Sequence, residues 1–342
     1  MSQETITILG GGLAGLSLGV ALRGRGIPVI LHEAIPYPRH RVCGEFISGI
    51  DDAVLEDLGI AADLSDAHRL SSTVWLDGNG ADLCRFALPH PARGISRHRL
   101  DLRLADRFRE SGGDLRIGRN ELPSDLRGWI DCRGRRANPV SRWIGLKCHF
   151  RPVELLADLE MHLGRGAYVG LAPVENGWVN VCGLFPKTPH LSARGPELLV
   201  AYLRQCGLPA LAERLAAAKA NVESFQGVSG LTLGEQLGSP AGGCVIGDRA
   251  RMICPFTGNG MSMAFESARA ALKPLTAYAN KDVSWNEACV QIQGRTRREH
   301  LFRTRAALGL QNLLFQPFWQ QAFTRISRFT PVPMRMLYHL TR

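Results

Sequence analysis

The sequence predicts a mixed α/β fold that begins with a Rossmann-type nucleotide-binding unit. A β-branched run at 5–9 leads directly into a glycine-rich turn and a helical apolar pattern. A second glycine-containing helix start, at 258–260, follows another short strand pattern. Between these places, apolar runs and turn signals in 51–94 and 141–235 are typical of β-strands. Together the three observations indicate a nucleotide-binding unit combined with a sheet-based unit.

The N-terminal turn fits the pattern G-x-G-x-x-G, and each of its three glycines has a physical reason. Gly10 permits the tight turn, Gly12 lets the backbone approach a pyrophosphate, and Gly15 lets the following helix pack closely against the strand. The helix N-terminus then offers N–H groups and its dipole to the phosphates. A second strand, predicted at 27–32, ends at Glu33, where a carboxylate can accept hydrogen bonds from an adenosine ribose.

The glycine pattern alone is weak evidence, but here the strand, helix, second strand and acid occur in the required order. The negative charge of Glu33 suits FAD or NAD and disfavours NADP, because it repels a 2′-phosphate. The residues predicted to line this end of the nucleotide are Gly10, Gly12, Leu13, Ala14, Gly15, Glu33 and Ala34.

The second motif begins with a strand pattern that ends on Asp248. Pro255 follows, and then Gly258 and Gly260 open a helix predicted over 261–273. Such a helix N-terminus, aimed at the N1–C2=O edge of a flavin, would stabilise the negative charge of the reduced ring, and Asp248 could bind the ribityl hydroxyls. The alternative is an ordinary turn between strand and helix that needs glycines for its geometry alone.

These motifs and three further ones give the sequence a resemblance to a known family. It is similar to the FAD-dependent aromatic hydroxylase superfamily, and within it to the branch of geranylgeranyl reductases and flavin halogenases. The motifs that carry the resemblance follow the order of the family and lie at 10–33, 41–45 (Arg-Val-Cys-Gly-Glu), 97–101, 130–135 (Ile-Asp-Cys-Arg-Gly-Arg) and 247–260. The resemblance implies bound FAD, with Arg41, Gly44 and Arg97 beside it. It also implies NAD(P)H as a transient electron donor, because the sequence has no second nucleotide-binding motif.

The fold of this family interleaves two domains, and the sequence pattern agrees with that arrangement. The predicted segments are 1–50, 95–140 and 236–290 for the FAD-binding domain, 51–94 and 141–235 for the substrate-binding β-sheet domain, and 291–342 for a C-terminal basic helical region.

The candidate catalytic residues lie in the loop after the second strand. In the resembling reductases the cysteine that corresponds to Cys43 lies near the reactive face of the flavin. Glu45 stands where a second glycine is common in that branch, so its role has to be argued from its chemistry: a general acid or base, or a group that orients a substrate hydroxyl. The alternative is that Glu45 pairs with Arg39 or Arg41 and only fixes the loop. No histidine or cysteine spacing indicates a metal site.

The positive charge of the chain is concentrated near its C-terminus. The 342 residues carry a formal net charge of +10, and residues 295–342 contain nine arginines and one acid. Helices that cover a substrate channel are one interpretation of this region, and contact with an anionic membrane surface is the other. Nucleic-acid binding is disfavoured, because no recognised binding motif accompanies the charge. The sequence contains no apolar run of membrane-spanning length and does not start like a secretory signal, so we expect a cytoplasmic protein, possible peripheral membrane contact aside.

The predicted function is that of an FAD-dependent, NAD(P)H-dependent monooxygenase that hydroxylates an apolar aromatic, phenolic or polyketide-like substrate. The first alternative is an FAD-dependent reductase of isoprenoid double bonds, which the elements at 43–44 and 131–134 favour. The second is a flavin carrier or binding protein without turnover. Halogenation ranks lower, because the W-x-W-x-I-P element of that group is missing.

Overall fold

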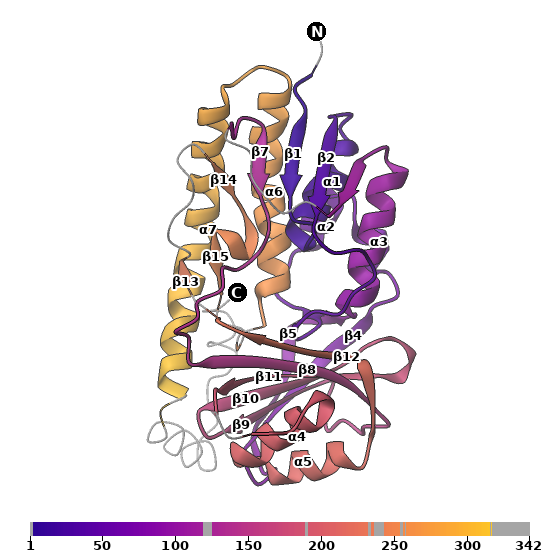
Figure 1. The fold of residues 1–342 in the computed structure, drawn as a ribbon, viewed down its shortest axis with the longest axis vertical. Coiled ribbons are helices and arrows are strands. Elements are labelled where there is room, and N and C mark those ends of the chain that lie inside the picture. Colours follow the sequence, from indigo (N-terminus) through magenta and orange to yellow (C-terminus); the bar gives the residue numbers. More distant parts are fainter. Residues whose placement is uncertain are drawn as a thin grey trace.

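The computed structural model describes residues 3–118, 125–188, 191–231, 234–235, 243–253, 256, 258–314 and 316. These residues form two sheets, one above the other in the view of Figure 1, with helices packed around them. The strands of the two sheets alternate in blocks along the chain, so the nucleotide-binding unit and the sheet unit are interleaved, as the sequence predicted.

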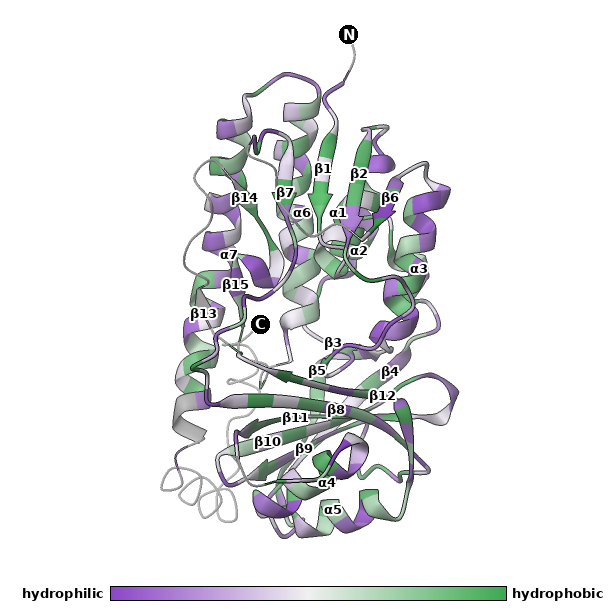
Figure 2. Ribbon diagram, in the orientation of Figure 1, coloured by the Kyte–Doolittle hydropathy of each residue, from purple (hydrophilic) through white to green (hydrophobic). Residues whose placement is uncertain are grey.

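The upper sheet has five parallel strands and is the Rossmann-type sheet. Its strands, in spatial order, are β14 (Cys244–Val245), β7 (Trp129–Asp131), β1 (Ile6–Leu9), β2 (Val29–Glu33) and β6 (Asp114–Ile117). β1 is buried along its whole length, which is typical of a central parallel strand covered on both faces. Hydrophobic residues accordingly dominate β1 and β2 in Figure 2.

The lower sheet has eight strands, most of them antiparallel. Its strands, in spatial order, are β12 (Lys219–Ser229), β8 (Trp143–Arg151), β11 (Val179–Pro186), β10 (Ala167–Pro173), β9 (Leu159–Gly164), β4 (His68–Leu76), β5 (Asp82–Gly94) and β3 (Phe46–Ile47). Between β10 and β11 the chain turns at Asn176 and Gly177, which both have positive φ, as the Asn-Gly sequence predicts for a tight hairpin turn. A short separate pair is formed by β13 (Gly234–Glu235) and β15 (Arg251–Met252).

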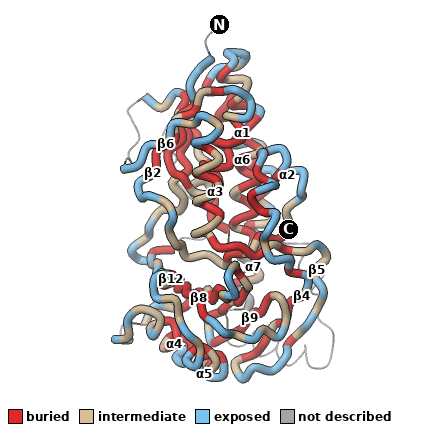
Figure 3. Tube along the Cα trace, turned by 90° about the vertical axis from the view of Figure 1, so that its right-hand side faces the viewer, coloured by how far each residue is buried: buried red, intermediate tan, exposed pale blue. Residues whose placement is uncertain are grey.

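Helices cover both sheets. The α-helices are α1 (Leu13–Arg23), α2 (Asp52–Asp57), α3 (Arg97–Glu110), α4 (Gly195–Gln205), α5 (Pro209–Ala216), α6 (Gly260–Ala279) and α7 (Trp285–Leu314). Short 3-10 helices in the described part of the chain are η1 (Ala61–Leu64), η2 (Glu175–Gly177) and η3 (Gly247–Arg249). α1 packs against α3 and α6, and buried residues concentrate on α1 and α6 in Figure 3. α4 and α5 cover the face of the lower sheet that points away from the upper one.

α7 connects the cores of the two units. Cys289 and Ile292, near its start, belong to the core around β1, while Ala307 belongs to a cluster on the lower sheet. The helix starts before the C-terminal region predicted from residue 291. Only the part of that region up to 314, with residue 316, lies among the described residues. None of the helices described is long and apolar enough to cross a bilayer.

The unit boundary near residue 50 differs from the prediction. β3, which we assigned with the first FAD-binding segment, pairs with β5 in the lower sheet. Val54, Leu55 and Leu64, which we assigned to the substrate-binding unit, instead pack into the core around β1. α2 and η1 are short, and their amphipathic pattern does not say which core will take their apolar side.

Candidate functional site

The glycine-rich loop between β1 and α1 has steric reasons for glycine at two of its positions and open space at the third. Gly10 has a φ of +108°, and a Cβ there would lie 2.5 Å from the Cys132 carbonyl group. A Cβ at Gly15 would lie 2.0 Å from the carbonyl oxygen of Gly10, so only glycine permits this packing. Around Gly12, by contrast, no heavy atom would lie within 4 Å of an added Cβ. No side chain caps the N-terminus of α1, so the loop leaves both space and N–H groups for a phosphate.

Glu33 lies buried at the end of β2, where the nucleotide ribose is expected. Its carboxylate accepts hydrogen bonds from the N–H groups of Gly11 at 2.8 Å and Ile35 at 3.1 Å. Arg39 contacts the same carboxylate at 2.7 Å. Burial favours a higher pKa for Glu33, but Arg39 and these hydrogen bonds lower the pKa below its usual value. The group is therefore a charged acceptor, and Arg39 lies across it.

Arg41 and Arg97 are held together by one buried acid, Asp101. Arg97 Nε donates to Asp101 Oδ1 at 2.7 Å, and Arg41 Nε donates to Asp101 Oδ2 at 3.2 Å. Arg97 is the first residue after the N-cap of α3, and Asp101 lies one turn later on the same face. The sequence motif at 97–101 included Asp101, but we did not predict its role, although the i,i+4 spacing could have shown it.

The second motif brings Asp248 close to these arginines. Asp248 is exposed to solvent, yet the protein that surrounds its carboxyl group raises its pKa to about 6. Arg97, Arg135 and Arg41 act in the opposite direction. The carboxyl group of Asp248 could bind hydroxyl groups of a dinucleotide, and the three arginines could bind its phosphates.

At the start of α6, the backbone again matches the predicted glycine roles. Gly258 has a φ of +68°, and a Cβ there would lie 2.3 Å from the Phe46 ring. Gly260 has open space, and no side chain caps the helix. Pro255 lies outside the described residues. α6 extends to Ala279, beyond the end predicted at residue 273. Pro274 lies inside the helix, on its buried face.

Among the remaining predicted cofactor contacts, Leu13 and Ala14 form the buried first turn of α1. Ala34 is exposed directly after β2. Gly44 lies close to Phe46, because a Cβ there would meet the ring at 3.1 Å.

Cys43 lies between the two units. Its backbone carbonyl accepts a hydrogen bond from Asn180 Nδ2 at 2.9 Å, and Arg97 interacts with its thiol. Burial raises the pKa of the Cys43 thiol, and Arg97 opposes this rise. The cysteine is therefore a protonated thiol at the junction of the loop with β11.

Glu45 is the centre of a buried ionic cluster. It is 0% exposed, and its carboxylate is 3.0 Å from Lys147 Nζ and 2.6 Å from His149 Nε2. The N–H of Arg97 donates to it as well, at 3.0 Å. Burial alone would raise the pKa of Glu45, but Lys147 and His149 lower it to about 2. Neither Arg39 nor Arg41, the partners that we considered, holds this carboxylate: they contact Glu33 and Asp101.

The backbone at Glu45 adopts a conformation that favours glycine. Glu45 has a φ of +58°, a left-handed conformation that costs a non-glycine residue about 1 kcal/mol or more. The side chain that replaces the glycine offsets this strain only because Lys147 and His149 reach it.

His40 and His98 continue the cluster towards the surface. Lys147 Nζ lies 3.2 Å from His40 Nδ1, and the His40 ring stacks on His98 with 4.5 Å between the ring centroids. Burial and the charge of Lys147 lower the pKa of His40 to about 3, so His40 is neutral and accepts from the ammonium group.

The ligand atoms of His40, Glu45 and His149 all lie within 4.8 Å of one another, as those of a metal site would. The Lys147 ammonium group already contacts two of these three residues. A metal ion at this place would be repelled by that charge, so the three residues do not support a metal site.

Sequence reasoning missed Lys147 and Asn180, and it assigned no function to His149 or His162. A lysine inside the apolar run of β8 was the available signal, because a buried lysine requires a partner. His149 lies on the face of the lower sheet that meets Glu45. His162 lies on the opposite face and pairs with Glu160, which also contacts Arg214. Asn180 gave no signal in the sequence.

Solved structures with a similar fold include a monooxygenase, a protein complexed with FAD and a flavin-dependent brominase. The p-nitrophenol 4-monooxygenase PnpA from Pseudomonas putida DLL-E4 matches with a TM-score of 0.77 and 14% identity, over 99% of this chain and 97% of that one. Klebsiella pneumoniae HpxO, complexed with FAD and uric acid, matches with a TM-score of 0.72 and 17% identity, over 98% and 95%. The flavin-dependent brominase Bmp2, as a triple mutant, matches with a TM-score of 0.75 and 16% identity, over 98% and 97%.

A search with family models found no match, and neither did a search of curated proteins. The structural likeness nevertheless extends over nearly the whole chain and includes both sheets. The chain therefore shares the fold of these proteins, which agrees with the fold that its motifs predicted.

Proposed function

We propose that this protein is an FAD-dependent monooxygenase that hydroxylates an apolar aromatic or phenolic substrate with NAD(P)H as electron donor. The observation that carries the proposal is the open space at Gly12, beneath the uncapped N-terminus of α1 and next to the buried carboxylate of Glu33. The likeness in fold to PnpA, a monooxygenase, and to HpxO, complexed with FAD, supports the same reaction class.

Bound FAD would supply the redox chemistry, taking electrons from NAD(P)H and passing them to oxygen. The residues of this chain would bind and orient it. The α1 N-terminus would bind the pyrophosphate, with Arg41 and Arg97 near it, and Glu33 would accept from the ribose. Asp248 and the start of α6 would hold the end that carries the flavin ring. The protein would also exclude water from the reacting atoms.

An aromatic cluster supports an apolar aromatic substrate. The Phe256 ring packs edge-on against both Trp75 and Tyr168, with 5.3 Å between centroids in each pair. Met161 and Leu163 of β9 belong to the same cluster. Phe256 lies in the segment between β15 and α6, so these rings lie where the second motif meets the lower sheet. Aromatic walls of this kind favour flat apolar ligands.

For the candidate catalytic residues, we propose a refined division of roles. Glu45 acts as a carboxylate that orients His149, because its low pKa makes it a poor proton donor at neutral pH. His149 is then the group that can exchange a proton with a substrate hydroxyl. Glu45→Gln with normal flavin content and unchanged turnover would remove this role.

The reductase of isoprenoid double bonds stays the second candidate function, and Cys43 is the observation that favours it. Saturation of a double bond needs a proton as well as a hydride, and a protonated thiol at the junction of the two units could donate one. The monooxygenase proposal does not need this thiol as a reactant.

Oxygen consumption separates these functions. Protein reconstituted with FAD is given NADH or NADPH, with and without lipophilic phenols. We expect a substrate to raise oxygen uptake at least about tenfold, because in such enzymes substrate positions the reacting atoms. Saturation of a prenyl chain without oxygen would instead support the reductase, and FAD binding without any turnover would support the carrier.

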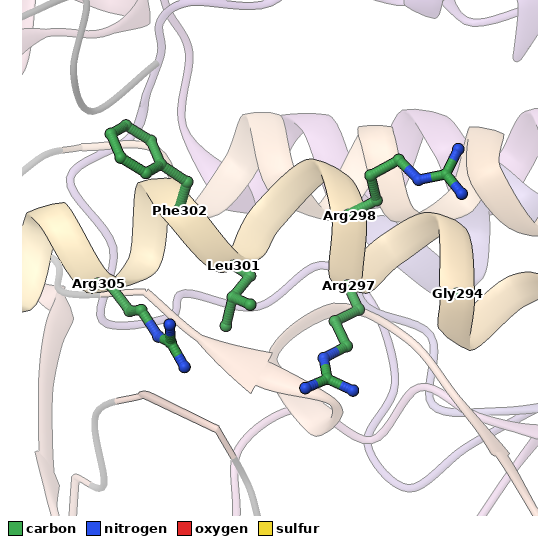
Figure 4. Close-up of a pocket in the computed structure, with 6 residues that line it drawn as sticks. All are labelled: Gly294, Arg297, Arg298, Leu301, Phe302 and Arg305. Atoms are coloured by element: carbon green, nitrogen blue, oxygen red, sulfur yellow. The ribbon is translucent and has the colours of Figure 1, made fainter.

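We further propose that the outer face of α7 contacts an anionic membrane surface. A surface pocket of about 450 Å³ on this helix is lined by Gly294, Arg297, Arg298, Leu301, Phe302 and Arg305. Figure 4 shows Arg297, Leu301 and Arg305 pointing to one side of the helix, while Arg298 and Phe302 point to the other. Phe302 is 64% exposed, and Val290, one turn before Gly294, is 63% exposed. Exposed apolar side chains between arginines suit the interface of an anionic bilayer.

Replacement of Arg297, Arg298 and Arg305 by glutamine should weaken binding to phosphatidylglycerol-containing vesicles about 100-fold, because each arginine near an anionic surface contributes about 1 kcal/mol. Cosedimentation measures this effect. The matched control replaces Arg109, Arg116 and Arg127, which are exposed around the upper sheet. These replacements should change vesicle binding little. Membrane contact through α7 would be contradicted if the wild-type protein bound vesicles of phosphatidylcholine alone as tightly as the anionic vesicles. It would also be contradicted if the two triple variants weakened vesicle binding equally.

A further inference from the structure

Asn180, in β11, has a buried acceptor atom without a hydrogen-bond partner. The residue is 0% exposed, and among the described residues Asn180 Oδ1 has no partner. The orientation of the amide is fixed, because Nδ2 donates to the Cys43 carbonyl at 2.9 Å and a carbonyl cannot donate in return. Oδ1 therefore points away from Cys43. An unpaired buried acceptor destabilises the folded protein, and such a group in a native fold calls for an explanation.

The register of the lower sheet shows what lies around this atom. Asn180 is directly opposite His149 of β8 and Ala172 of β10, so all three side chains share one face of the sheet. Two residues along, the neighbouring row on the same face runs through Lys147, Cys182, Gly170, Met161 and Trp75. This is the face that meets Cys43 and Glu45, and through them the nucleotide-binding unit.

Gly170 leaves an opening in the middle of this face. A Cβ at Gly170 would meet only two backbone oxygens, each 3.9 Å away. Gly170, Cys182, Met161 and Trp75 are all partly exposed, although strands lie on both sides of each. A glycine inside a strand with open space above it is typical of a place where a ligand approaches the backbone.

The opening has one polar and one apolar side. Asn180 and His149 lie towards β8, and Met161 and Trp75 lie towards β4, next to the aromatic cluster around Phe256. A ring that lies over Gly170 would thus have apolar side chains towards β4 and the side chains of Asn180 and His149 towards β8. The acceptor can be satisfied only by a group that carries an O–H or N–H.

We propose that Asn180 Oδ1 accepts a hydrogen bond from the hydroxyl group of the substrate, whose ring lies over Gly170. Asn180 is then the residue that selects phenols over ring compounds without a donor. This assignment rests on the proposed function and adds the substrate class that the site accepts. The other source of a donor would be an N–H group of the flavin, which the experiment distinguishes.

The test compares 2-naphthol with 2-methoxynaphthalene, which has the same ring system but no O–H. Binding is measured by calorimetry, on protein with and without FAD. The wild-type protein should bind 2-naphthol about 5- to 150-fold more tightly than the ether, the range expected when a buried acceptor gains or lacks its partner. Asn180→Leu should abolish this preference. Gly170→Leu should weaken the binding of both probes by a similar factor and keep the preference for 2-naphthol. Asn286→Leu, the same change at an exposed position of α7, should alter nothing.

Three outcomes would overturn the assignment. The first is wild-type protein that binds both probes equally or binds neither. The second is Asn180→Leu that keeps both the preference and the FAD affinity of the wild-type protein. The third is Asn180→Leu that keeps the preference and loses FAD affinity, which would assign the acceptor to the flavin. Failure of the wild-type protein to take up FAD, measured separately by its visible absorbance, would contradict the proposed function and not the preference for the naphthol.

Discussion

Replacement of Gly12 by valine is expected to abolish FAD binding while the protein stays folded. Gly12 has a φ of −84° and a ψ of −173°, an extended conformation that valine adopts readily. An added Cβ would have no heavy atom within 4 Å, so we expect the fold to accept the side chain. It would, however, occupy the space through which a pyrophosphate approaches the α1 N-terminus. We expect a loss of FAD affinity of at least about 100-fold, because several charged hydrogen bonds at the helix N-terminus would be lost together.

Two further glycine variants serve as controls for this result. Gly294→Val, at an α7 glycine that also has open space around it, should bind FAD like the wild-type protein. Gly15→Val should fail to fold, since its Cβ would lie 2.0 Å from the Gly10 carbonyl oxygen. Flavin fluorescence measures the affinity, and circular dichroism checks the fold. If Gly12→Val takes up FAD with wild-type affinity, the nucleotide does not lie along this loop.

The second large effect concerns the pair Lys147–Glu45. Lys147→Met should lower the free energy of unfolding by about 3–5 kcal/mol, because it leaves the buried Glu45 carboxylate without its strongest partner. Glu45→Gln should be similarly destabilising, since it leaves the ammonium group uncompensated. The double variant should regain part of the loss, as expected when both charges of a buried pair are removed.

Urea denaturation measures these differences, with Lys219→Met as the control at an exposed position of β12. The pH dependence has a defined sign. The pKa of Glu45 lies near 2 in the folded protein, below the usual 4.5, so its contribution is fully present above pH 4.5 and is lost as the pH falls towards 2. If Lys147→Met has the same free energy of unfolding as the wild-type protein, the pair contributes nothing to stability. The strain at Glu45 would then need another explanation.

The candidate site divides into a part with a local sequence signature and a part without one. The opening β-α-β unit has such a signature, because its elements all lie within residues 6–33 and steric rules fix where glycine must stand. The buried cluster has none. His149 reaches Glu45 across 104 residues, and Asn180 reaches Cys43 across 137. Glu45 in place of a glycine showed that something was unusual there, but not which residues would contact it.

The sequence by itself determined the fold class, the glycine-rich loop and the acid at the end of β2, because periodicity and glycine sterics act over short stretches of chain. Only the tertiary structure decided that α2 joins the first core, that Lys147 and His149 hold Glu45, and that Asn180 keeps a free acceptor. These outcomes depend on how two interleaved sheets meet. The register of β8 against β11, and the loop packed on them, determine which polar atoms are paired and which are left for a ligand.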